Sequence, residues 1–151
     1  MKNKEYLLKI YSSYLPYELQ FIYSRDIPSE VNTWKLVGLI DRKDSDSDFF
    51  AKAIRSDYKN QINVTLSLMK PILYSMDNLT KEIEHKGEKF YPYEKLHLCF
   101  SDVINLLNED LWIGQWWDYE KVCKLIEWHF NVFNLPDELI VRVSEDFNPY
   151  K

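Results

Sequence analysis

The sequence predicts an α+β fold, with a small antiparallel β-meander in the first half packed against two main helices in the second half. Period-two alternation of apolar residues in the first half and helical spacing in the second half are the patterns that predict it. An aromatic content of 16% with only three glycines in 151 residues indicates a packed body with a core of its own. Because nothing has the composition of a linker or a repeat, we expect one globular domain over residues 1–151.

The first predicted element is a short amphipathic helix from Lys4 to Leu15, which Pro16 ends. Four strand-like segments follow, and they predict a meander of three or four antiparallel strands. Their ranges are residues 18–23, 34–41, 49–55 and 62–68.

The strand pattern is clear in one of these segments and ambiguous in another. Residues 62–68 alternate best, because every second residue is apolar. Residues 49–55 fit either a returning strand or a helix capped by Ser47, and we favour the strand. The polar run at residues 42–48 predicts the exposed turn before it.

The second half is expected to begin with a short helix over residues 76–85, capped by Asp77 or Asn78 and ended near Gly87. A brief extended piece follows at residues 88–91.

The first main helix is predicted over residues 93–109, which have the best helical pattern of the chain. Pro92 stands near its first turn, where a missing N–H costs little. Beyond the second main helix we expect a last strand at residues 139–143 and a polar tail at residues 144–151.

The stretch from Leu111 to Phe133 holds four of the five tryptophans and is our candidate for the core element. From residue 119 onward its apolar residues fill an arc wider than the stripe of a surface helix, which predicts a helix over residues 118–133 that is packed on several sides. Asp118 is the predicted N-cap. His129, near the centre of the apolar arc, is predicted to be a core histidine bonded to a backbone carbonyl.

The charge is distributed unevenly along the chain. Residues 1–75 carry eleven Lys/Arg and nine Asp/Glu, whereas residues 76–151 carry eight and fifteen. An acidic surface repels phosphate, so we do not expect a nucleic-acid partner, although a mimic of nucleic-acid charge would have the same imbalance. The more general interpretation is a solvated surface that aids solubility.

No segment predicts export or a membrane span. The first twenty residues lack the apolar core of a secretory signal, and no apolar run reaches the length of a membrane helix. Two cysteines, Cys99 and Cys123, do not make a disulfide framework, so we expect a reducing, cytoplasmic setting.

Metal and catalytic patterns in the sequence are incomplete. Asp44, Asp46 and Asp48 match the first three ligands of a calcium loop, but the loop positions that need glycine and glutamate hold Phe49 and Arg55. We therefore interpret the three aspartates as part of a solvated turn.

A zinc site or a Cys/His catalytic pair would draw on His97, Cys99, Cys123 and His129. His97 and Cys99 lie two apart on a predicted helix, roughly 200° around its axis, so they do not converge on one ion. Both cysteines are predicted to be small buried residues beside apolar faces, which is not the setting of a reactive thiol. We therefore expect no metal, no cofactor and no catalytic residue.

The tryptophans Trp112, Trp116 and Trp117 form the candidate partner surface of the sequence. Exposed aromatic residues near a flexible glycine often anchor a partner. The alternative is that Trp112 and Trp116 cover the core while Trp117 packs before the N-cap Asp118, and the general burial of large apolar residues favours this alternative.

Two segments, LMKPILYSMDNLTKEIEHKGEKFYPYEKL at residues 68–96 and IEWHFNVFNL at residues 126–135, resemble small uncharacterised proteins encoded by phages and prophages of gut bacteria. An L-P-Y element at residues 15–17 resembles the same proteins. The chain departs from their pattern at Asn134, where glycine is expected, and at residues 41–60. The resemblance implies a phage-linked setting inside the host cell, and it transfers no catalytic residue.

Two functions are expected from these observations. The first is a non-enzymatic accessory or interaction protein of phage origin, whose acidic second half or tryptophans contact a host or phage protein. The alternative is a small-ligand binder or enzyme with a pocket near His129 and the tryptophans.

Overall fold

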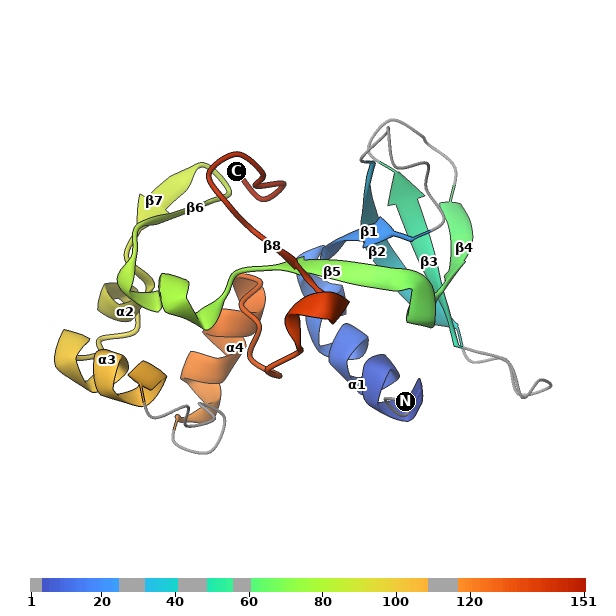
Figure 1. Cartoon of the computed structure of the whole chain (residues 1–151). Coiled ribbons are helices and arrows are strands. Elements are labelled where there is room, and N and C mark those ends of the chain that lie inside the picture. The colour runs from blue at the N-terminus through green and yellow to red at the C-terminus, as the bar shows by residue number, and fades with distance from the viewer. Residues whose placement is uncertain (1–3, 25–31, 41–48, 56–60, 109–116) are drawn as a thin grey trace. The chain divides into compact units, whose positions relative to one another are not determined.

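The computed structural model describes residues 4–24, 32–40, 49–55, 61–108 and 117–151 (Figure 1). The α+β fold class is confirmed, with a sheet in the first half and helices in the second. The chain forms two compact units. Unit 1 comprises Met1–Ile72 and Asp137–Val141, and unit 2 comprises Leu73–Pro136 and Arg142–Lys151.

Unit 1 begins with the predicted helix, α1 (Lys4–Tyr14). Its apolar side is fully buried at Ile10, Tyr11 and Tyr14. The Tyr11 hydroxyl donates to the backbone carbonyl of Met69 at 3.2 Å, which ties the helix to the last strand of the meander. Burial raises the pKa of Tyr11 well above its ordinary value, so this hydroxyl stays a donor.

The sheet confirms the predicted meander and adds strands to it. Its six strands have the order β4-β3-β2-β1-β5-β8, and β1 pairs antiparallel with both β2 and β5. Residues 49–55 form a strand, as we favoured, and its backbone pairs antiparallel with β2 on one side and β4 on the other. The strands are β1 (Gln20–Tyr23), β2 (Thr33–Ile40), β3 (Phe50–Arg55), β4 (Gln61–Thr65), β5 (Met69–Leu73) and β8 (Val141–Arg142).

One face of this sheet is the core of unit 1. Residues that share the face by register include Phe21, Leu36, Ala51, Ala53 and Val64, each at most 2% exposed. The predicted strand at residues 62–68 is shorter than expected, because Leu66–Leu68 turn as a 3-10 helix before β5. That turn contacts α1 and buries Leu66.

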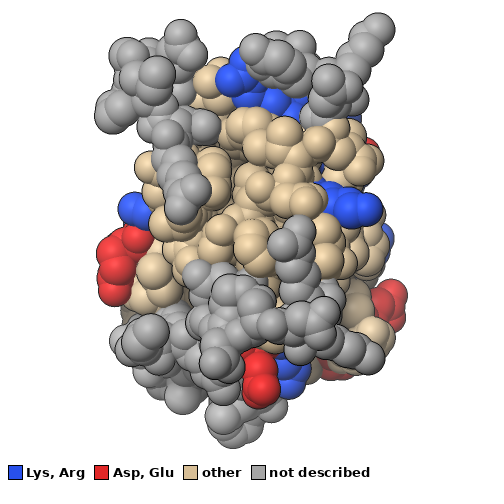
Figure 2. All heavy atoms as spheres, turned by 90° about the vertical axis from the view of Figure 1, so that its right-hand side faces the viewer, with Lys and Arg blue, Asp and Glu red and all other residues tan. Residues whose placement is uncertain are grey.

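Figure 2 looks onto the side of the molecule where Figure 1 draws β3 and β4. The middle of its described surface is uncharged, and the Lys, Arg, Asp and Glu side chains that it shows lie near the margins. Gln61 and Asn63 of the edge strand β4 are exposed and polar.

Unit 2 is organised around Tyr74. Its backbone N–H donates to the carbonyl of His129 at 2.8 Å, and its carbonyl accepts from Asn131 at 2.9 Å. Its ring stacks on Phe130 with centroids 5.4 Å apart. The elements around it are a 3-10 helix (Met76–Thr80), β6 (Ile83–His85), β7 (Glu88–Phe90), α2 (Pro92–Lys95), α3 (Phe100–Asn108) and α4 (Tyr119–Glu127).

The helix predicted over residues 76–85 is wrong beyond its first turn. The 3-10 helix is capped by Ser75, whose hydroxyl accepts from the N–H of Asp77, and residues 83–90 form a hairpin instead. Lys86 and Gly87 make its two-residue turn with positive φ at both positions, which matches the twist of paired strands. Gly87 is therefore the second residue of a hairpin turn and does not end a helix.

The helix predicted over residues 93–109 is broken into α2 and α3. His97 adopts the left-handed conformation (φ 55), and the N–H of Leu98 reaches back to the carbonyl of Tyr93 at 2.9 Å. The N–H of His97 bonds to the carbonyl of Glu94 at 3.0 Å. This pair of bonds closes a helix C-terminus, a role that glycine usually has.

The helix predicted over residues 118–133 also ends early, at Glu127. His129 is left-handed (φ 61), its N–H bonds to Ile126, and the N–H of Phe130 bonds to Leu125, so the same closing pair recurs. The predicted N-cap is confirmed, because the Asp118 carboxylate accepts from the N–H of Lys121 at 3.0 Å.

The prediction that α4 is packed on several sides is wrong. Tyr119 is 85% exposed, and among the residues of α4 only Leu125 is buried. The deeply buried residues lie after the helix, in the segment from Trp128 to Val132.

The last residues pack into the fold. The predicted strand at residues 139–143 is a 3-10 helix (Asp137–Leu139) followed by the short β8. Tyr150, in the predicted polar tail, is only 6% exposed. Its carbonyl accepts from the N–H of Lys86 at 2.6 Å, which fastens the end of the chain to the hairpin turn.

Candidate functional site

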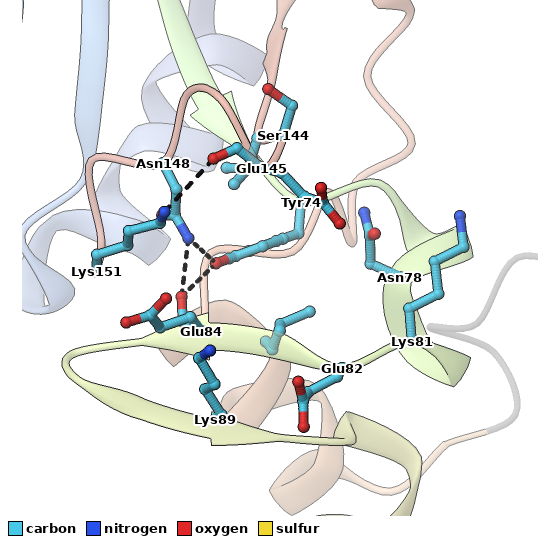
Figure 3. Close-up of a pocket in the computed structure, with 12 residues that line it drawn as sticks. Tyr74, Asn78, Lys81, Glu82, Glu84, Lys89, Ser144, Glu145, Asn148 and Lys151 are labelled. Atoms are coloured by element: carbon cyan, nitrogen blue, oxygen red, sulfur yellow. Dashed lines mark hydrogen bonds between the residues drawn. The ribbon is translucent and has the colours of Figure 1, made fainter.

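A pocket of about 540 Å³ lies within unit 2 (Figure 3). It is bounded by the 3-10 helix at residues 76–80, the β6–β7 hairpin and the segment after β8. Tyr74 crosses its middle in Figure 3, with the hairpin on one side and the C-terminal segment on the other. Its volume is in the range of small-molecule sites.

A hydrogen-bond network fixes one end of this pocket. The Tyr74 hydroxyl donates to the carbonyl of Glu84 at 2.7 Å, and the amide of Asn148 donates both to that carbonyl and to the Tyr74 oxygen at 2.9 Å. The Asn148 oxygen accepts from the N–H of Tyr150 at 2.9 Å. The Asn148 amide nitrogen therefore holds the C-terminal segment against β6, while its oxygen binds the backbone two residues further along that segment.

Burial determines the protonation state of Tyr74. Desolvation raises its pKa to about 12, the carboxylate of Glu84 adds to this, and the hydrogen bond from Asn148 acts against it. At neutral pH the hydroxyl therefore stays protonated and donates its hydrogen bond to the backbone carbonyl of Glu84. Tyr74 is thus a structural donor at the pocket.

A stack of three rings packs beside the pocket, in the core of unit 2. His129 lies parallel to Tyr150 with centroids 3.9 Å apart, and His85 is tilted against both at 5.2 and 5.8 Å. His85 is 6% and His129 is 1% exposed. Among the described residues, neither ring nitrogen of His85 has a hydrogen-bond partner.

The surroundings of His85 oppose its protonation. Burial, and then the positive charge of Lys86, lower its pKa to about 4, while Glu127 raises it by a smaller amount. His85 is therefore neutral at physiological pH. An uncharged imidazole with no polar partner behaves here as a flat core ring.

A second feature of unit 2 is an exposed cluster of aromatic rings, the aromatic surface, made of Tyr91, Tyr93 and Phe100. Tyr93 meets both others at its edge, with centroids 6.1 Å from Tyr91 and 5.5 Å from Phe100. Tyr91 is 40% and Phe100 is 50% exposed. This arrangement depends on the break at His97, because the chain changes direction there between Tyr93 in α2 and Phe100 in α3. In one continuous helix these two rings would have a different spacing.

The sequence-predicted ligand residues do not gather at one point. His129 is buried, as predicted, whereas His97 is exposed. The prediction that both cysteines are buried is wrong, because Cys99 is exposed and Cys123 is half-buried. Over the described ranges, no group of three or more His, Cys, Asp or Glu side chains is placed to hold a metal ion.

Cys99 stands just before α3, and its environment favours the thiolate. Hydrogen bonds from the Ser101 hydroxyl, 3.2 Å from Sγ, and from the backbone N–H groups of Ser101 and Asp102 lower the pKa of its thiol. The electropositive N-terminus of a helix has this effect in general.

Several predicted positions lie outside the described residues. They include the calcium-like aspartates Asp44, Asp46 and Asp48 and two of the three tryptophans, Trp112 and Trp116. Trp117 is described and is half-buried. Neither Trp117 nor His129 lines the pocket of Figure 3.

The charge imbalance follows the division into units. Unit 1 carries eleven Lys/Arg and eleven Asp/Glu, and unit 2 carries eight and thirteen, so the net charge of −5 belongs to unit 2. Both the pocket and the aromatic surface are in this acidic unit.

None of the described helices has the length and apolar character needed to cross a membrane.

The aromatic surface and the pocket differ in how far the sequence marks them. Tyr91 and Tyr93 flank Pro92, and a helix that starts at this proline is a local signal for rings at the surface. The pocket joins Tyr74 to Asn148, which are 74 residues apart, and no local pattern marks that contact.

Comparison of the chain with protein-family models, with curated proteins and with solved structures finds no match.

Proposed function

We propose that this protein is a non-enzymatic accessory protein of a phage or prophage, and that it works in the host cytoplasm by binding a partner protein through the aromatic surface. The observation that carries the proposal is the contact of Tyr91, Tyr93 and Phe100 at the surface of unit 2, with two of the rings 40% and 50% exposed. Contiguous exposed aromatic residues are typical anchors of protein interfaces.

The geometry of the three rings suits an anchor. Edge-to-face contacts hold each ring in place and contribute about 0.5–1.5 kcal/mol per pair. A preorganised surface loses little side-chain entropy when a partner binds. Tyr91 directly precedes the short helix α2, Tyr93 lies in α2, and Phe100 begins α3. The turn at His97, with its two closing hydrogen bonds, connects these two helices.

Charge indicates the chemistry of the partner. The exposed side chains of Glu94 and Asp102 flank the rings, and the Glu94 carboxylate accepts from the Tyr93 hydroxyl at 3.1 Å. Because unit 2 as a whole is acidic, the complementary surface is an apolar socket with basic residues around it. The same charge disfavours nucleic acid, so salt-dependent retention of DNA by this chain would contradict the proposal.

The experiment uses Cys99, which is exposed and directly precedes Phe100. A photoreactive maleimide is attached to Cys99 in a Cys123→Ser background, and the labelled protein is irradiated in host lysate. We expect one discrete protein adduct, identified by mass spectrometry, that weakens as the salt concentration rises because the flanking contacts are ionic.

Matched variants decide whether the adduct depends on the aromatic surface. The double variant Tyr91→Ser, Phe100→Ser should lose the adduct. Tyr119→Ser removes a more exposed aromatic residue that is not part of the cluster and should keep it. Absence of an adduct, or an equal yield in both variants, would overturn the proposal.

The phage-linked part of the proposal rests on the resemblance of residues 68–96 and 126–135. Its test is independent of the binding experiment. Genes for virion or prophage proteins beside the coding sequence would support it, and a neighbourhood of cellular metabolic genes in every genome carrying the sequence would contradict it.

A further inference from the structure

The pocket of Figure 3 is lined by six charged side chains of both signs. Three are lysines and three are glutamates, so the lining as a whole is electrically neutral. They are Lys81, Glu82, Glu84, Lys89, Glu145 and Lys151. The charges come from opposite sides of the pocket, because Glu145 and Lys151 belong to the C-terminal segment and the other four to the hairpin and the turn before it.

These charged groups do not neutralise one another. Within the part of the chain that the structure describes, none of the six forms an ion pair. Glu84 and Lys89 are direct cross-strand neighbours in the hairpin, and even they do not pair. The Lys151 ammonium donates a hydrogen bond to the backbone carbonyl of Glu145 at 3.4 Å, and this bond does not involve the Glu145 carboxylate.

Apolar surface lies between the charges. The ring of Tyr74 and the side chains of Ile83 and Val143 contribute it. All three residues are buried, so these walls are fixed by the core behind them. The Tyr74 hydroxyl and the Asn148 amide are already bonded to the Glu84 carbonyl, and the Asn78 amide nitrogen and the Ser144 hydroxyl oxygen also bond to the backbone. The charged side chains are therefore the strongest polar groups that the pocket offers a ligand.

A ligand for such a pocket must carry both charges and an apolar body. A simple anion would meet three carboxylates and a simple cation three ammonium groups, so neither gains net attraction from the lining. A molecule with one ammonium and one carboxylate can approach a Glu with the first and a Lys with the second. Such ion pairs contribute more to the free energy of binding in a partly enclosed pocket than on an open surface.

We propose that this pocket binds a small zwitterion, of the size of a free amino acid or a dipeptide with an apolar side chain. The volume of about 540 Å³ accommodates either. The hydrogen bonds of Asn148 to Tyr74, to the Glu84 carbonyl and to Tyr150 fix the C-terminal segment against β6 before the ligand arrives, so this end of the site is preorganised. This site is separate from the aromatic surface, and its failure would leave the proposed partner binding untouched.

The test compares one compound with its singly charged derivatives by isothermal titration calorimetry on the full chain. The probes are phenylalanine, leucine and the dipeptide Leu-Phe as zwitterions, N-acetylphenylalanine as the anion and phenylalaninamide as the cation. We expect saturable binding of at least one zwitterion with a Kd below about 10 mM, and binding at least about tenfold weaker for both singly charged derivatives of phenylalanine.

Two variants and a control locate the binding. Glu145→Gln and Lys89→Met each remove one charge from the lining and should weaken zwitterion binding at least about threefold. Asp146→Asn removes an exposed carboxylate next to Glu145 that does not line the pocket, and it should bind as the parent does. Equal binding of a singly charged derivative, no binding of any zwitterion, or equal loss in Asp146→Asn and Glu145→Gln would overturn the assignment.

Discussion

The buried imidazole of His85 should make unit 2 lose stability in mildly acidic solution. Its ordinary pKa of 6.5 falls to about 4 in the folded chain, because burial, and then Lys86, disfavour the charged form more than Glu127 favours it. Between these two values the unfolded chain binds a proton that the folded chain excludes. Stability is therefore full above the unfolded pKa and is lost as the pH falls from 6.5 toward 4.

The size of the effect follows from the two pKa values. Their separation corresponds to about 3 kcal/mol when the whole interval is crossed, and about 2 kcal/mol of this is lost between about pH 7.5 and about pH 5. The loss is large beside the total stability of roughly 5–15 kcal/mol of an ordinary domain.

Urea unfolding of the wild type and of His85→Phe at these two pH values measures the effect. Phenylalanine keeps a flat ring against His129 and Tyr150 but cannot be protonated, so the variant should lose about 2 kcal/mol less than the wild type on acidification. His97→Asn removes an exposed histidine at a left-handed position that asparagine tolerates, and it should retain the wild-type pH dependence. Parallel losses in the wild type and in His85→Phe would refute the reasoning.

Three further predictions concern other parts of unit 2. Cys99 should react with iodoacetamide faster than Cys123 at neutral pH, because it is exposed and its thiol pKa is lowered; peptide mass spectrometry measures this, and equal rates would contradict it. Asn131→Ala should cost about 2 kcal/mol in urea unfolding, since the side chain accepts from the N–H of Leu135 and donates to its carbonyl at 2.9 and 2.8 Å in a buried turn. Gly87→Ala should cost about 1 kcal/mol from backbone strain alone, because φ is 78 and no atom within 4 Å would meet the new methyl group; a loss no larger than that of an exposed alanine substitution elsewhere would contradict this origin.

The strands of unit 1 could be predicted because their signals are local. Residues 34–41 alternate over enough positions to define one face, whereas residues 49–55 also fitted a helix and were only favoured as a strand; both form strands close to the expected bounds. The polar run between them marked a connection without any need of tertiary information. The meander order then follows from short connections between antiparallel neighbours.

The helices were predicted too long for one physical reason. At both main helices the apolar spacing continues past the point where the backbone turns away, and the residue that turns is a histidine. Glycine would have marked each end, but histidine adopts the left-handed conformation often enough to close a helix when its neighbours are satisfied. The neighbours of His129 are satisfied in this way, because the N–H of Phe130 donates the closing hydrogen bond to the carbonyl of Leu125 and both residues are fully buried.

The left-handed turn at His129 also explains why the candidate site could not be predicted. It redirects the chain so that residues 129–131 bond to the backbone of Tyr74 and so that the His129 ring lies on Tyr150. Tyr74 and Asn148 can then meet across 74 residues and fix one end of the pocket. The contact of Tyr74 with Asn148 thus depends on the bonds to Tyr74, and these depend on the turn at His129. Only that turn is indicated by the sequence, where the apolar pattern continues beyond the end of the helix that it begins.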